Sequence, residues 1–185
     1  FPAWDVLPHE ARLPHADVLS ERLETLIHLA KRRKPSANST APGPVIVTTG
    51  VALLQRTFSP SELKNRFRNF KLGERIDPLD LVEWLEDQGY EPEAQVSQKG
   101  ELALRGGILD VFPLASPWPV RFEFFGDEIE SLRTFDPQTQ IYREKIDRTT
   151  ISPGGELGIL KQQLDADAGY ATGRLGDYLA VDPLC

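Results

Sequence analysis

The sequence predicts an α/β segment followed by a strand-rich α+β module, and three observations lead to this fold class. Apolar residues recur at helical spacing over residues 17–33, a β-branched run follows a Pro- and Gly-rich stretch, and beyond Glu93 the hydrophobic pattern alternates with a period of two. A chain of 185 residues with 40% hydrophobic content is long enough to bury a sizeable core.

The first part of the chain is predicted to be an amphipathic helix over residues 17–33, which the segment KPSANSTAPGP ends. The next run, VIVTTG at residues 45–50, is apolar and β-branched, which is typical of a strand buried in a parallel sheet. VALLQR is expected to form a helical turn directly after this strand.

Two shorter helices have clear start signals. The sequence SPSE at 59–62 predicts a short helix, with Ser59 as the N-cap and Glu62 reaching back to complete a capping box. An Asp-Pro pair at 77–78 predicts a second start, and Gly89 stands where a left-handed C-terminal cap is expected.

The second half of the chain is predicted to be a set of strands. The segments with period two are AQVSQKG, ELALRGGILDVFP, PVRFEFFGDEIESLRTFD and QIYREKIDRTTIS. Gly106-Gly107 interrupts the second segment, where we expect a bulge or bend. Gly126-Asp127 fits a two-residue type II′ hairpin turn, because glycine tolerates the positive φ of its first position.

One strand has an unusual face. Val120, Phe122 and Phe124 form one side of the pleat, so Arg121, Glu123 and Phe125 share the other side. With Arg105 presented from the preceding strand, this face has the composition of an interface hot spot. The alternative is that Phe125 is covered by another segment, and that the arginines pair with Glu123 and Glu130.

No catalytic, cofactor or metal site is predicted. The sequence contains no phosphate-binding Gly-Lys-Ser/Thr loop, its three histidines are scattered, and its single cysteine is the last residue. The acids Asp127, Glu128 and Glu130 are interpreted as a solvated turn rather than an acid/base pair. A formal net charge of -7 argues against a general nucleic-acid-binding surface, and Lys31 to Lys34 is interpreted as a helix end.

The chain is expected to be a piece of a longer cytoplasmic polypeptide. It contains no methionine, it stops within the apolar run AVDPLC, and no stretch has the composition of a signal peptide or membrane helix. From Pro153 onward, with leucines at 157, 160 and 164, the pattern is weak. We expect this part to be connecting structure that returns to the first segment.

The strand segments carry a resemblance to a known family. GELALRGGILDVFP followed by PVRFEFFGDEIESLRTFDPQTQ resembles the nucleotide-excision-repair module shared by UvrB and the transcription-repair coupling factors (Mfd). FPAWDVLPHEARLPHADVLSERLETLIHL and VTTGVALLQRTFSP resemble the N-terminal region of the coupling factors, so these are favoured over the alternative, a fragment of a UvrB-type damage-loading helicase.

The resemblance implies a protein-binding module, with no enzymatic activity and no cofactor of its own. Its partner would be UvrA, while RNA polymerase and DNA would be bound by the rest of a full-length translocase. By motif match, Arg105, Arg121 and Phe125 would lie at the centre of the UvrA contact, with Asp127 and Glu128 at its edge.

The resemblance also implies how the chain is divided. Residues 1–69 and 154–185 would form the two parts of a split, partial Rossmann-like α/β domain. The UvrB domain 2-like module, residues 70–153, would be inserted between them.

Overall fold

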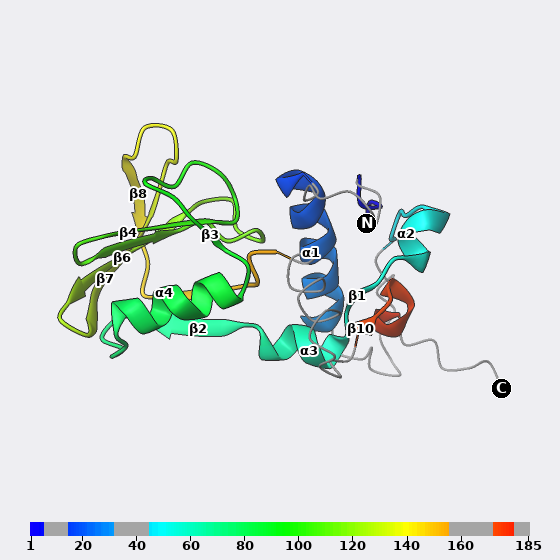
Figure 1. Cartoon of the computed structure of the whole chain (residues 1–185), viewed down its shortest axis with the longest axis horizontal. Helices are drawn as coiled ribbons and strands as arrows, with labels where there is room; N and C mark the ends of the chain where they lie inside the picture. The colour runs from blue at the N-terminus through cyan, green and yellow to red at the C-terminus, as the bar shows by residue number, and fades with distance from the viewer. Residues whose placement is uncertain (6–14, 32–44, 156–171, 180–185) are drawn as a thin grey trace, which may run out of the picture.

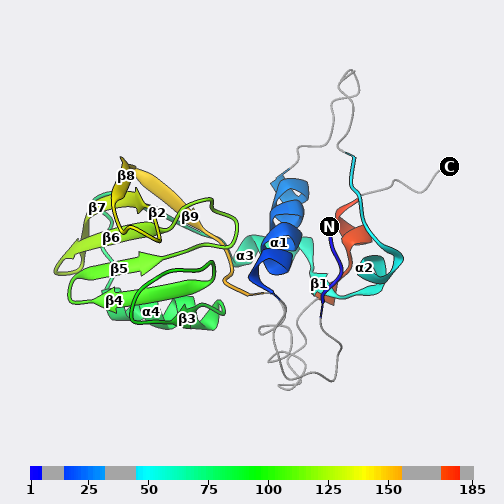
Figure 2. The same ribbon diagram turned by 90° about the horizontal axis from the view of Figure 1, so that it is seen from above.

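The computed structural model describes residues 1–5, 15–31, 45–155 and 172–179. A six-stranded sheet with helix α4 (Pro78–Asp87) forms one body, and helix α1 (Ala16–Lys31) lies beside it with several short elements (Figures 1 and 2). The basic residues 32–34, the leucines at 157, 160 and 164, and the terminal AVDPLC run lie outside the described residues. None of the described helices combines the length and the apolar character needed to cross a membrane.

The short elements pack around α1. They are α2 (Gly50–Leu54), β1 (Thr57–Phe58), α3 (Pro60–Asn65), β10 (Thr172–Gly173) and η1 (Leu175–Tyr178). Leu23 and Leu26 of α1 are fully buried in a cluster with Phe58, as their helical spacing predicts. The capping serine is confirmed, because Ser59 Oγ accepts a hydrogen bond from the Glu62 N–H at 3.2 Å. The capping box is not, because the Glu62 carboxylate instead accepts from Arg66 Nε at 2.9 Å.

The prediction of a buried strand at residues 45–50 is wrong. This segment runs extended into α2 without pairing to any described strand, and Val45 and Val47 are 90% and 80% exposed. A β-branched run becomes a buried strand only where a neighbour supplies ladder hydrogen bonds and cover. Around α1 the described strands form only the antiparallel pair β1–β10, so the Rossmann-like arrangement stays a proposal.

The main sheet confirms a strand-rich α+β module. Its spatial order is β3 (Glu91–Pro92), β4 (Glu101–Arg105), β5 (Ile108–Val111), β6 (Val120–Phe125), β7 (Glu128–Phe135) and β8 (Tyr142–Lys145). The pair β3–β4 is parallel and the other neighbours are antiparallel. The sheet is therefore mixed, and consecutive strands of the chain lie next to each other.

One face of this sheet carries the core. Helix α4 and the antiparallel pair of β2 (Arg68–Lys71) and β9 (Arg148–Ile151) pack against it. Phe70 of β2 meets Phe122 of β6 edge to face, with 5.5 Å between ring centroids. The residues buried in this cluster are Phe70, Leu81, Leu85, Tyr90, Leu102, Leu109, Val111, Val120, Phe122, Ile129, Leu132 and Ile151.

Two of the predicted strands are wrong in their extent. AQVSQKG forms no strand, because the Glu101 carboxylate accepts hydrogen bonds from the N–H groups of Ser97 and Gln98, which folds the segment into a turn. QIYREKIDRTTIS divides at residues 146–147 into β8 and β9, which join different sheets. The division lets Ile151 enter the core beside β2.

The turns follow glycine. Gly106-Gly107 is a two-residue hairpin turn between β4 and β5 rather than a bulge within one strand, and Gly106 has a φ of +62°. The II′ turn at Gly126-Asp127 is confirmed, since Gly126 has a φ of +62° and Asp127 is not among the positive-φ residues. Gly89 ends α4 with a φ of +84°, as predicted.

Candidate protein-docking surface

The second face of the main sheet carries the residues singled out in the sequence. Val120 and Phe122 of β6 are buried in the core, while Arg121 and Glu123 point to the opposite side. Phe125 follows on that side and is 79% exposed. The predicted alternation of β6 is therefore confirmed, and Phe125 has no cover from the described residues.

Arg121 does not pair with Glu123 or Glu130, the carboxylates named in the alternative interpretation of this face. Its Nε and Nη2 atoms donate to Oδ1 and Oδ2 of Asp110, each at 2.7 Å. Asp110 lies opposite Arg121 on β5 and is completely buried. The pair forms a two-pronged, charge-assisted contact, and hydrogen bonding to Asp110 raises the pKa of Arg121 above its usual high value.

Arg121 is enclosed on its other sides as well. Its guanidinium carbon lies 4.6 Å from the centroid of the Phe135 ring, and its Nη2 donates to Gln140 Oε1 at 3.3 Å. The side chain is 11% exposed. Arg121 thus forms the floor of this surface, and its charge is largely withdrawn from solvent.

Arg105 has a different exposure. Its Nη2 donates to Oδ2 of Asp110 at 2.9 Å, so one carboxylate oxygen accepts from both arginines. The Arg105 side chain is 47% exposed. Two guanidinium charges against one carboxylate leave a surplus positive charge, and Arg105 is the member of the group that presents it to solvent.

A second polar cluster lies beside Glu123. Glu123 Oε1 accepts from the Tyr142 hydroxyl at 3.1 Å, and Glu123 Oε2 lies 3.5 Å from Arg133 Nη2. The Arg133 guanidinium also stacks over the Tyr142 ring at 4.5 Å. Glu123 therefore has polar partners on β7 and β8. The polar side chains next to Phe125 are paired with each other, while the Phe125 ring is exposed.

The residues predicted for the edge of the surface lie at the β6–β7 hairpin. Asp127 is exposed in the turn, and Glu128 Oε2 lies 3.6 Å from Arg75 Nη2. Both side chains of this ion pair are largely solvent-accessible, so it contributes little to stability. Arg105, Arg121 and Phe125 share one face of one sheet, with Asp127 and Glu128 next to Phe125.

Sequence reasoning missed Asp110, which links the two arginines. Its signal was present, because an aspartate inside the apolar strand segment ILDVF must be paired if it is buried. Tyr142 and Gln140 were also missed. They come from β8 and the turn before it, and nothing in their local sequence indicates that they reach β6.

The surface suits binding rather than catalysis. It offers an exposed aromatic ring and a half-exposed guanidinium fork, the side chains that dominate protein interfaces. In the part of the chain that the structure describes, no group of three or more His, Cys, Asp or Glu side chains is arranged to hold a metal ion.

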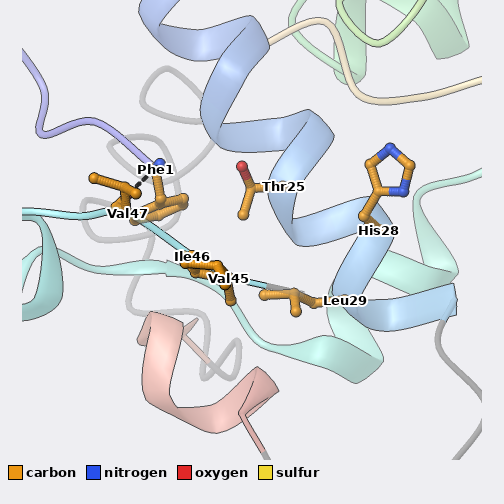
Figure 3. Close-up of a pocket in the computed structure, with 7 residues that line it drawn as sticks. All are labelled: Phe1, Thr25, His28, Leu29, Val45, Ile46 and Val47. Carbon is orange, nitrogen blue, oxygen red and sulfur yellow. Dashed lines mark hydrogen bonds between the residues drawn. The ribbon is translucent and has the colours of Figure 1, made fainter. Parts of the chain in front are cut away.

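A separate cavity of about 700 Å³ lies beside α1 and is lined by Phe1, Thr25, His28, Leu29, Val45, Ile46 and Val47. Figure 3 shows Val45 to Val47 on the extended segment next to α1, with the Phe1 amino group donating to the Val47 carbonyl at 2.8 Å. The lining of this cavity is mainly apolar, and its side chains do not bring together the acid, base and nucleophile that a catalytic site needs.

The mixed six-stranded sheet with α4 on one face defines a strand-rich module of the α+β class. Residues 69–157 match the family model described as the UvrB interaction domain. This part of the chain belongs to that family.

Curated relatives match most of the chain. A transcription-repair-coupling factor of Haemophilus influenzae is 37% identical over 159 residues, which is 85% of this chain and 13% of the relative. The factor of Escherichia coli is 36% identical over 154 residues, and that of Staphylococcus aureus strain MRSA252 is 33% identical over 163 residues. These two matches cover 83% and 88% of this chain. The chain itself spans about 13% of the length of each relative.

Proposed function

We propose that this chain is the part of a transcription-repair coupling factor that recruits UvrA. The observation that carries the proposal is the face holding Phe125 and Arg105, one 79% exposed and the other with a 47% exposed side chain, inside the segment that matches the UvrB interaction domain. The aromatic ring can bury apolar area against a partner, while the guanidinium beside it can make a two-pronged contact with a partner carboxylate. RNA polymerase and DNA would be bound by other parts of the full-length protein.

The relatives support a coupling factor rather than a UvrB-type helicase. Three of them, from separate bacteria, carry the name transcription-repair-coupling factor and match 83–88% of this chain, including the residues before the UvrB interaction domain. We further propose that residues 1–69 and 154–185 belong to one α/β domain with residues 70–153 inserted. The pairing of Thr57 with Gly173 supports this, because it joins the chain on either side of the insertion.

Calorimetric titration of the chain with purified UvrA tests the proposal. Phe125→Ala should weaken binding about thirtyfold, which corresponds to about 2 kcal/mol, and Arg105→Ala should weaken it about tenfold. Phe125 is largely exposed and the Arg105 side chain is about half exposed, so truncation of either leaves the core intact.

The matched control is Leu79→Ala. Leu79 is 67% exposed, but it lies on α4, which packs against the other face of the sheet. This variant should bind UvrA as the parent does. Absence of binding by the folded parent, or equal losses in Phe125→Ala and Leu79→Ala, would overturn the proposal. Salt-sensitive binding to DNA alone would point to a different function.

A further inference from the structure

The buried carboxylate of Asp110 stands at the centre of the arginines on the docking surface. It accepts two hydrogen bonds from Arg121 and one from Arg105, all between 2.7 and 2.9 Å. Asp110 is completely buried, and its strand places it between Ala103 of β4 and Arg121 of β6. A charge in this position must be satisfied by its neighbours, so it restrains both guanidinium groups.

The two arginines use this carboxylate differently. Arg121 is held by both prongs, by Gln140 and by the Phe135 ring, and little of its side chain remains accessible. Arg105 is held at one terminal nitrogen only. A guanidinium has five N–H donors, so most of the donors of Arg105 remain available to a partner carboxylate.

We infer that Asp110 is a positioning residue of the docking surface. It keeps the Arg121 guanidinium bound against the sheet, and it holds Arg105 in the orientation in which Arg105 contacts an acidic group of the partner. The inference rests on the proposed function for the identity of the partner. It assigns direct contact to Arg105 and Phe125, and an indirect role to Arg121 and Asp110.

The energetic reason is preorganisation. A free arginine side chain loses rotamer entropy when a partner orders it, and a side chain already held by Asp110 loses less. The single anchoring bond also orients the planar guanidinium, which a lysine at this position would not reproduce.

The first measurement needs neither a variant nor a partner. Side-chain heteronuclear NOEs of the arginine Nε–H groups in the ¹⁵N-labelled chain report their order. Arg105 should be nearly as ordered as the backbone, whereas Arg75, whose side chain is 72% exposed and paired at 3.6 Å, should be mobile. An Arg105 as mobile as Arg75 in the parent would overturn the inference.

The second measurement is a double-mutant cycle with UvrA. Arg105→Ala should weaken binding about tenfold in the parent and less than about twofold in the Asp110→Asn background, since contacting residues couple. Phe125→Ala should weaken binding by the same factor in both backgrounds. Equal factors for Arg105→Ala in both backgrounds would mean that the two residues are not coupled, which contradicts a positioning role. Phe125→Ala is the control, because a general structural defect would change the effect of both substitutions.

Two provisions keep the outcomes distinct. If Asp110→Asn does not fold, Arg105→Lys in the otherwise unchanged chain replaces it, and binding close to the parent's would overturn the inference. A parent that fails to bind UvrA overturns the proposed function, while the NOE of Arg105 still decides whether Asp110 orders this side chain.

Discussion

Arg121 and Asp110 lie directly opposite each other on neighbouring strands and are joined by two hydrogen bonds of 2.7 Å. The relationship explains how a charged residue can stand in β6, between the buried Val120 and Phe122, without an exposed side chain. It also means that substitutions of Arg121 act on folding as well as on any surface above it.

Removal of Arg121 alone should destabilise the chain. Arg121→Met leaves Asp110 buried with only Arg105 as a cationic partner, and we expect the free energy of unfolding to fall by about 3 kcal/mol. The double variant Asp110→Leu, Arg121→Met should recover at least half of this loss, because no buried charge remains. Urea unfolding monitored by tryptophan fluorescence measures both. A double variant no more stable than Arg121→Met would contradict this account of the pair.

The stability of the chain should fall at high pH because of Tyr90. Burial raises the pKa of Tyr90 well above the ordinary value of a tyrosine, near 10, and its hydroxyl donates to the Ser152 carbonyl at 2.8 Å. The unfolded phenol ionises near pH 10 while the folded one stays neutral. This stabilisation is therefore complete below pH 10 and is lost as the pH rises further, by about 1.4 kcal/mol per pH unit.

The matching variant is Tyr90→Phe. It should lose about 1 kcal/mol at neutral pH through the missing hydrogen bond, and its unfolding free energy should lack the part of the alkaline slope that Tyr90 supplies. Unfolding titrations of both proteins at pH 7, 10 and 11 give the difference. Identical slopes would show that Tyr90 does not carry this pH dependence.

Gly154 should not tolerate a side chain. A Cβ atom built there would lie 2.6 Å from Cδ2 of the buried Tyr90 ring, which the core holds in place. We expect Gly154→Ala to destabilise the chain by about 2 kcal/mol. Gly50→Ala is the control, since a Cβ there meets nothing within 4 Å. Thermal melts should separate the two variants, and equal melting temperatures would refute the close contact.

The β6–β7 turn should require Gly126. With a φ of +62°, Gly126→Ala should cost about 1–2 kcal/mol of unfolding free energy, because a Cβ is disfavoured in this conformation. Asp127→Ala, at the exposed second turn position, should change it by less than about 0.5 kcal/mol. Chemical denaturation of the two variants tests the difference, and the prediction fails if both behave alike.

Local signals predicted much of the fold. Helix starts at Ser59 and Asp77, the left-handed Gly89 and the II′ turn at Gly126 depend on a few adjacent residues, and all four are found. The alternation of β6 is equally local, so the face shared by Arg121, Glu123 and Phe125 was predictable. The candidate surface could be located for this reason before its contacts were known.

The predictions of secondary structure failed where a segment depends on contacts with residues beyond its own local sequence. Residues 45–50 have strand-like composition but no described strand beside them, and the N–H groups of Ser97 and Gln98 bind the Glu101 carboxylate instead of a neighbouring strand. Likewise, QIYREKIDRTTIS alternates as one strand, yet its two halves find different neighbours in space. Composition alone does not specify which neighbour a strand-forming segment will meet.

The sequence by itself determined the strand-rich module, the II′ turn at Gly126 and the face on which Arg121 and Phe125 stand, because backbone geometry repeats over a few residues. Only the tertiary structure decided that Phe125 remains exposed, that Arg121 is enclosed and that Arg105 carries the accessible charge. The physical reason is that burial depends on strands and side chains brought together from distant positions. Asp110, Phe135 and Gln140 surround Arg121 only after β5, β6 and β7 have assembled.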